Sequence, residues 1–292
     1  MVRTLWTAAS GMIGQQTNVD TIANNLANVN TVGYKTEVNE FKSLLYQTLQ
    51  TKTTTANGEN KPISAQVGLG VRNASITSQF TQGAFLESEN PTAFAIGGDG
   101  FFAVQTGTTP ADIRYTRNGN FIFAMGDAEG NTIKLTDSDG HPVLKTDGEP
   151  LVLTLADIQA VNGDVDALMA DRITVDESGQ LMYPDAQNNP QFIEVGGNPV
   201  SIGLYQFQNA SGLKKEGDSL YSVTAASGAA INEFDNANVE KSVIRQGYLE
   251  GSNVQVADEM VNLIIAQRAY EMNSKAIQAA DTMMQEANEL RR

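Results

Sequence analysis

The stretch that decides the fold runs from Leu5 to Val29 and reads "LWTAASGMIGQQTNVDTIANNLANV". Apolar residues recur in it every seven residues, with a second series three residues later; these are Leu5, Met12, Val19 and Leu26, then Ala8, Ile22 and Val29. This is the a/d pattern of helices that pack side by side. Gly33 suits the left-handed position that follows a helix. The pattern therefore predicts a helix that ends between Val29 and Thr31 and packs against another helix.

The same stretch is rich in asparagine, which is a poor helix former. Asn24, Asn25 and Asn28 lie outside the apolar series, on an adjoining face of the expected helix. One explanation is a solvated polar face. The alternative is that neighbouring copies of the chain bury these amides, which then pair with one another and fix the register without burying charge.

A second heptad pattern fills the other end of the chain. Its two apolar or small series are Leu263, Tyr270, Ile277 and Met284, then Ala266, Asn273, Ala280 and Ala287. Ser252 and Gln255 have the spacing of a capping box, which predicts the start of a helix of about 35 residues and about 50 Å. Asp258 and Glu259 in its opening turns, and Arg291 and Arg292 at its end, match the helix dipole. We expect the two terminal helices to pack as a coiled-coil-like pair, although an ordinary two-helix buttress would show the same periodicity.

Between the two ends the apolar period changes to two, with frequent turn residues. Asn118-Gly119 and Ser178-Gly179 each lie between alternating apolar runs and predict β-hairpins. The fold class is therefore α+β multidomain, with an all-β middle domain. We expect residues 1–35 plus 250–292 to form the helical domain, 93–221 the outer β domain, and 36–92 plus 222–249 a connecting segment with an extended loop at 50–66.

Charge and hydropathy exclude several kinds of partner. The formal charge is −15, and the segment 127–199 carries fourteen acidic and three basic residues, which indicates a solvated acidic surface. No basic patch is available for nucleic acid. No apolar run reaches the roughly 18 residues of a membrane span. The first residues lack the apolar core of a cleaved signal peptide, so we expect a soluble protein whose export would use another route.

The chain shows no residue constellation typical of catalysis. It has no cysteine, and its one histidine, His141, lies between Gly140 and Pro142 in an expected turn. Asp137 to Gly140 resembles half a calcium loop but lacks the remaining ligands. We therefore predict no catalytic, metal or cofactor site and no cofactor.

Two long segments carry a family resemblance. Leu5 to Lys35 resembles the N-terminal signature of bacterial flagellar rod and hook proteins, and Gln246 to Gln285 resembles their C-terminal signature. The central "FAIGGDGFFAVQ" and "YTRNGNF" are also similar to this family. "QQTN", "FKSLLYQTL" and "VGLGVR" most resemble its distal-rod members, with proximal-rod and hook proteins as alternatives. The stretch 121–144 is longer and more acidic than is usual in the family.

The resemblance implies a structural protein of the basal-body rod that crosses the periplasm. It implies helical self-assembly into a hollow tube that transmits torque and passes exported subunits, with terminal helices inside and the β domain outside. The implied partners are proximal rod proteins, the hook protein, L- and P-ring or equivalent bushing proteins, and the flagellar type III export apparatus, without a cleaved signal peptide. A secreted wall-active enzyme and an adhesin-like module are the alternatives from other classes.

We predict that the assembly interface draws on both terminal helices. Its expected residues are Leu5, Met12, Val19, Asn24, Asn25, Leu26, Asn28, Val29, Gly33, Met260, Leu263, Ile264, Gln267, Arg268, Ala269, Tyr270, Asn273, Ile277 and Met284.

Overall fold

The computed structural model describes residues 2–50, 65–107, 112–126, 131–162, 169–185, 187–195, 197–236 and 239–290. The chain forms two compact units. Unit 1 comprises Met1–Asn28, Thr36–Gln79 and Val254–Arg292, and unit 2 comprises Val29–Lys35 and Phe80–Asn253. A helix at each end and a mainly β middle region confirm the expected fold class in outline. The division into three parts, with its boundaries, stays a prediction.

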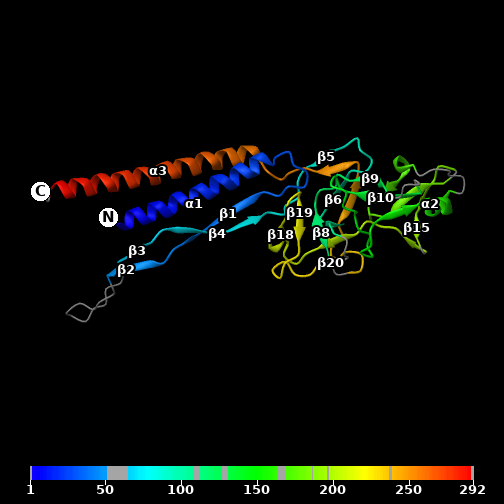
Figure 1. Ribbon diagram of the computed structural model, residues 1–292, viewed down its shortest axis with the longest axis horizontal. Coiled ribbons are helices and arrows are strands. Elements are labelled where there is room, and N and C mark those ends of the chain that lie inside the picture. Colours follow the sequence, from blue (N-terminus) through cyan, green and yellow to red (C-terminus); the bar gives the residue numbers. More distant parts are fainter. Residues whose placement is uncertain are drawn as a thin grey trace. The chain divides into compact units, whose positions relative to one another are not determined.

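The two terminal helices of unit 1 lie side by side and run in opposite directions (Figure 1). They are α1 (Val2–Ala27) and α3 (Val256–Glu289). Gly11 permits their close approach, because a Cβ at this position would lie 2.8 Å from Nδ2 of Asn273. The 34 residues of α3 span about 51 Å at 1.5 Å per residue, as expected. No helix in the described part of the chain is both long and apolar enough to cross a membrane.

The predicted ends of these helices need correction. α1 ends at Ala27, before the expected Val29, and the amide of Asn28 donates to the carbonyls of Asn24 and Asn25, both at 3.1 Å. Gly33 has the expected left-handed backbone, with φ 69°, but it lies in a later turn of unit 2 and does not cap α1. Gln255 is the N-cap residue of α3 and makes no capping side-chain bond, so the predicted capping box is wrong. Arg291 and Arg292 lie outside the described residues.

A long two-stranded ribbon completes unit 1. β1 (Glu37–Ser43) pairs antiparallel with β4 (Val71–Ser78), and β2 (Tyr46–Gln50) pairs with β3 (Ala65–Gly68). β1 and β4 run along α1 (Figure 1), where Gly14 leaves room for the ring of Phe41. Most of the predicted loop at 50–66 lies outside the described residues.

Unit 2 is built around a six-stranded antiparallel sheet. Its strands, in spatial order, are β18 (Lys214–Lys215), β19 (Leu220–Ser222), β8 (Ile113–Thr116), β7 (Phe101–Gln105), β17 (Leu204–Gln206) and β20 (Ile231–Asn232). Two three-stranded sheets accompany it: β11 (Val152–Thr154), β10 (Thr132–Thr136) and β9 (Ile122–Met125); and β12 (Thr174–Val175), β13 (Leu181–Pro184) and β14 (Pro190–Phe192).

Short strand pairs and helical turns complete unit 2. The pairs are β5 (Phe85–Glu87) with β22 (Tyr248–Glu250), β6 (Phe94–Gly97) with β21 (Val243–Gln246), and β15 (Glu194–Val195) with β16 (Asn198–Pro199). The helical elements are α2 (Leu155–Val161) and the 3-10 turns η1 (Ala170–Arg172) and η2 (Ala210–Gly212). Aromatic rings are prominent in the core, where Phe102 and Phe121 meet edge to face at 5.1 Å.

One predicted hairpin is confirmed and the other is wrong. β12 and β13 pair around Gly179, whose φ is 82°. The strands on either side of Gly119 do not pair with each other, because β8 pairs with β7 and β19 while β9 pairs with β10. Gly119 instead lies against the backbone carbonyl of Phe94, which a Cβ would strike. The glycine allows a close approach of two backbones rather than a tight turn.

Candidate assembly surface

The side of α3 away from its a/d series exposes apolar side chains, most of them in its first three turns. Six of its side chains are at least half exposed, and they occupy heptad positions other than a and d; they are Met260, Val261, Ile264, Ile265, Met272 and Met283. Four of them, Met260, Val261, Ile264 and Ile265, lie within two turns of one another, and clustered exposed apolar surface marks a site of interaction with another molecule. In unit 1 taken alone, α3 therefore has an uncovered face, which we call the α3 outer face.

α1 and the ribbon expose further large apolar side chains. Trp6 and Ile13, seven residues apart on α1, are 72% and 67% exposed. Leu45, Tyr46 and Leu49 in and beside β2 are also more than half exposed. All these residues belong to unit 1, so this unit carries apolar surface on both helices and on the ribbon.

The a/d residues predicted from the sequence are on average less exposed than this outer face. Leu5, Met12, Val19, Leu26, Leu263, Asn273, Ile277 and Met284 are half-buried, and Ala8, Ile22, Ala266 and Ala280 are buried. Tyr270, at 43% exposed, and Ala287, which is also exposed, are the exceptions. Among the other expected interface residues, Met260, Ile264, Gln267 and Arg268 are exposed and Ala269 is half-buried. Val29 and Gly33 belong to unit 2.

A groove runs between α1 and α3. It has a volume of about 390 Å³ and is lined by Gln16, Val19, Gln267, Tyr270 and Glu271. Three of the residues predicted for the interface, Val19, Gln267 and Tyr270, therefore meet in one concave surface. An apolar floor with amide and carboxylate groups around it suits a protein side chain better than a charged small molecule.

The asparagines of α1 have different roles. Asn25 is buried, and its side chain bonds both backbone groups of Glu37: Nδ2 donates to the carbonyl at 2.8 Å and Oδ1 accepts from the amide at 2.9 Å. The same Nδ2 lies 3.2 Å from Oε1 of Glu259. The amide of Asn25 thus joins α1, β1 and α3 within one chain, so its expected burial by a neighbouring copy is not needed. Asn24 and Asn28 bond one another on the exposed side at 3.1 Å.

The carboxyl of Glu259 depends on this contact. Burial raises the pKa of Glu259, the hydrogen bond from Asn25 opposes this shift, and the nearby charge of Asp258 adds to it. Asn25 therefore supports a carboxylate that would otherwise be poorly solvated at the start of α3.

Replacing Asn25 by Leu should destabilise unit 1 by about 1–3 kcal/mol, because the amide and carbonyl of Glu37 would lose their partners. Hydrogen exchange of the Glu37 amide and thermal loss of helical circular dichroism would measure the effect. Asn24→Leu is the matched control, since Asn24 is exposed and its contact to the Glu37 carboxylate is 3.5 Å. Equal effects of the two substitutions would contradict this role of Asn25.

Sequence reasoning missed a buried charged cluster in unit 2. Oε1 of Glu250 accepts from Nζ of Lys35 at 2.6 Å, from Nε2 of Gln82 at 2.8 Å and from the amide of Gly83 at 2.9 Å. Its Oε2 lies 3.2 Å from Nη1 of Arg117, and all three charged side chains are almost fully buried. We call Lys35, Arg117 and Glu250 the charged cluster. Charges so far apart in the sequence give no local signal, although each lies within three residues of a glycine.

The side chains of Asp137, Asp139 and His141, which could suggest a metal site, have a structural role in a turn. Oδ1 of Asp137 accepts from the amides of Asp139 and His141, both at 2.9 Å, and its Oδ2 lies 3.0 Å from Nδ1 of His141. These three side chains are close enough to hold a cation, but the bonds are those of a turn closed by an aspartate. The turn predicted around His141 is confirmed.

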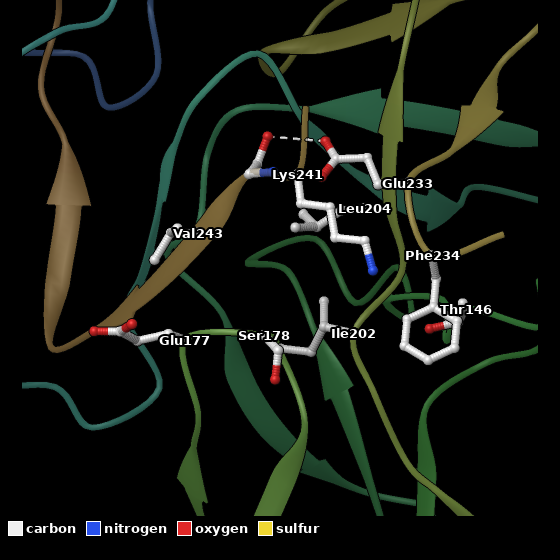
Figure 2. A pocket seen from close by; sticks show the side chains of 10 residues that line it. Thr146, Glu177, Ser178, Ile202, Leu204, Glu233, Phe234, Lys241 and Val243 are labelled. Carbon is white, nitrogen blue, oxygen red and sulfur yellow. Dashed lines mark hydrogen bonds between the residues drawn. The ribbon is translucent and has the colours of Figure 1, made fainter. Parts of the chain in front are cut away.

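Unit 2 also has a pocket of about 260 Å³ with an apolar floor that includes Ile202 and Leu204 (Figure 2). The carboxylate of Glu233 at its wall accepts from the amide of Ser242 at 2.7 Å and from its hydroxyl at 2.8 Å. Nε2 of Gln206 donates to the same carboxylate at 2.9 Å. Glu233 therefore anchors the backbone of Ser242 and is not poised as an acid or base.

Family models match three segments of the chain. Residues 5–35 match the flagella basal body rod protein model, residues 95–183 the flagellar hook protein FlgE/F/G D1 domain, and residues 245–290 the flagellar basal body rod FlgEFG protein C-terminal model. The segments include most of α1, much of unit 2 and all of α3.

Full-length relatives agree with these matches. A flagellar basal-body rod protein FlgG of Borreliella burgdorferi is 40% identical over 294 residues, covering 100% of both chains. FlgG proteins of Agrobacterium fabrum and Bacillus subtilis are 37% and 34% identical, over 97% and 100% of both chains. The chain therefore belongs to the family of bacterial flagellar basal-body rod and hook proteins, which are structural proteins and not enzymes, and within it the chain is close to the FlgG rod proteins.

Proposed function

We propose that this protein is a structural subunit of the distal flagellar rod, which assembles helically with copies of itself into a hollow tube. The α3 outer face carries the proposal. Six large apolar side chains on a helix that already packs against α1 need a further cover, and a second copy of the chain supplies one. The full-length FlgG relatives support the rod as the assembly.

The geometry of unit 1 suits a helical assembly rather than a closed dimer. Exposed apolar residues lie on α3, on α1 and on the ribbon, so one copy offers several different surfaces. Contacts between different surfaces are heterologous, and they generate a helix when the rotation between copies does not close. We infer that the a/d series holds α1 and α3 together in a coiled-coil-like manner. The outer faces then remain for neighbouring subunits.

The remaining parts of the proposal rest on membership of the flagellar rod family. The terminal helices form the inner wall of the tube and the β region lies outside, where exposed acidic side chains such as Asp139 and Glu149 face solvent and surrounding proteins. The tube crosses the periplasm, carries torque to the hook and passes exported subunits. Its partners are proximal rod proteins, the hook protein, the ring proteins that act as a bushing, and the flagellar type III export apparatus, which needs no cleaved signal peptide.

Electron microscopy of the concentrated, purified protein tests this proposal. We expect straight tubes of one fixed diameter, and the amount of tube should rise with protein concentration above a threshold. Discrete particles at every concentration would contradict helical self-assembly. A proximal-rod or hook role would instead require a partner protein for growth, or would give curved tubes.

A further inference from the structure

The segment Val29–Lys35 follows α1 directly in the sequence but belongs to unit 2. The amide of Gly33 in this segment donates to the carbonyl of Glu250 at 2.8 Å. Gly33 has φ 69°, and a Cβ there would lie 2.7 Å from the carbonyl carbon of Arg117 and 2.8 Å from the amide nitrogen of Asn118. The segment is therefore pressed against the backbone at Arg117 with no room for a side chain. We call Val29–Lys35 the strap.

The strap ends in the charged cluster. Nζ of Lys35 donates to Oε1 of Glu250 at 2.6 Å and to the carbonyl of Thr81 at 2.7 Å. Glu250 also accepts from Gln82, Gly83 and Arg117. One carboxylate thus joins four segments of unit 2, and three of them, at Lys35, Gln82–Gly83 and Glu250 itself, lie close to where the chain passes between the two units.

The bonds of the strap to Glu250 span more of the sequence than the other bonds among the described residues of unit 2. Lys35 and Glu250 are 215 residues apart. In contrast, the β10–β11 and β12–β13 pairs join strands that are near one another in sequence. Closing a long loop costs more chain entropy than closing a short one, so local pairings form before distant ones.

We propose that the strap docks last when unit 2 folds, and that Glu250 is the latch that holds it. Unit 2 then reaches its full stability only when both the segment before Thr36 and the segment after Tyr248 are present. A chain that lacks either end keeps unit 2 incomplete. This makes the strap a device that couples completion of unit 2 to the availability of the whole chain, and it stands independently of the rod proposal.

Kinetics of the full-length chain test the order of events. Gly33→Ala and Gly148→Ala should be compared by denaturant jumps followed by tyrosine near-UV circular dichroism. Both glycines have positive φ, 69° and 79°, but a Cβ at Gly148 meets nothing within 4 Å. The comparison therefore separates loss of strap docking from backbone strain.

If the strap docks after the rate-limiting step, Gly33→Ala should accelerate unfolding about tenfold or more and leave the refolding rate within about twofold. Gly148→Ala should change both rates much less. A refolding rate that falls in step with the rise in unfolding would overturn the proposal, as would equal behaviour of the two variants. If Gly33→Ala does not fold, Tyr34→Ala is the milder strap variant, because its ring faces Nζ of Lys215 at 5.9 Å. For Tyr34→Ala, too, faster unfolding with an unchanged refolding rate would support the proposal, and a refolding rate that falls in step would overturn it.

Discussion

Tubes should be absent when Leu263 is replaced by Asp, at every concentration at which the unmodified protein forms them. Leu263 is a half-buried a-position residue of α3, and Leu26 is its counterpart on α1. Burying a leucine side chain contributes about 1.5–3 kcal/mol, and a carboxylate in its place also loses solvation. Because every subunit repeats the change, the helix pair is weakened in every subunit that a tube would need. Leu26→Asp should have the same effect.

The design separates loss of assembly from loss of folding. Gln278→Asp is the matched control, since it adds the same charge to α3 at an exposed position beside the a/d series. Near-UV circular dichroism of both Leu variants should retain the aromatic signal of unit 2, whose core contains neither residue. Normal tubes from Leu263→Asp or Leu26→Asp, seen by electron microscopy, would refute the helix-pair interface.

The second large effect is expected at Glu250. Replacing it by Gln should lower the free energy of unfolding of unit 2 by about 3–5 kcal/mol, because Lys35 and Arg117 would stay buried without their carboxylate. Nε of Arg117 already has no hydrogen-bond partner among the described residues, so the guanidinium depends strongly on its contact with Glu250. Chemical denaturation of the full chain measures the change. Glu149→Gln is the control, since the Glu149 side chain is 75% exposed and its pair with Lys145 should add little.

The loss at Glu250 should also depend on pH. Burial lowers the pKa of Lys35, and the negative charge of Glu250 is the strongest influence that opposes this shift. Without that charge the folded pKa of Lys35 falls further, so the unfolded chain binds more protons than the folded one up to the ordinary value of 10.5. Stability then rises with pH in this range. The deficit of Glu250→Gln should therefore shrink as the pH rises from the folded pKa of Lys35 in the variant to its higher folded pKa in the unmodified protein, both of which lie below 10.5. A deficit that is constant with pH would contradict the assignment.

The helices and the β character of the middle region could be predicted because they rest on repeated patterns. A heptad series over four repeats still predicts a helix when one position, such as Gln15, is polar. In the middle region the alternation of apolar and polar residues occurs in several separate stretches, so the prediction of strands does not depend on any one of them. The predictions of the helix ends and of the Asn118-Gly119 hairpin are wrong, since each rests on only one or two residues. Gly33 and Gly119 carry the expected glycine signals, but each serves a close approach of two backbones that only the tertiary fold creates.

The interface residues also divide into those that a repeated pattern predicts and those that depend on the tertiary fold. Periodicity identified the half-buried a/d series, but it gave no reason to select Trp6, Ile13 or Met272, which are among the most exposed apolar residues. Asn25 was selected for a contact between copies, whereas its bonds are to Glu37 and Glu259 of its own chain. A side chain that bonds residues 12 and 234 positions away cannot be recognised from local spacing.

The antiparallel course of α1 and α3 brings the first turn of α1 and the last turn of α3 to the same end of unit 1 (Figure 1). Dyes attached in these two turns would therefore lie close enough for resonance energy transfer whenever the helices are paired. The signal would fall if they separate, while unit 2 keeps its own spectrum. The protein thus offers a built-in pair of labelling positions that follows helix pairing in solution, before and during growth of a tube.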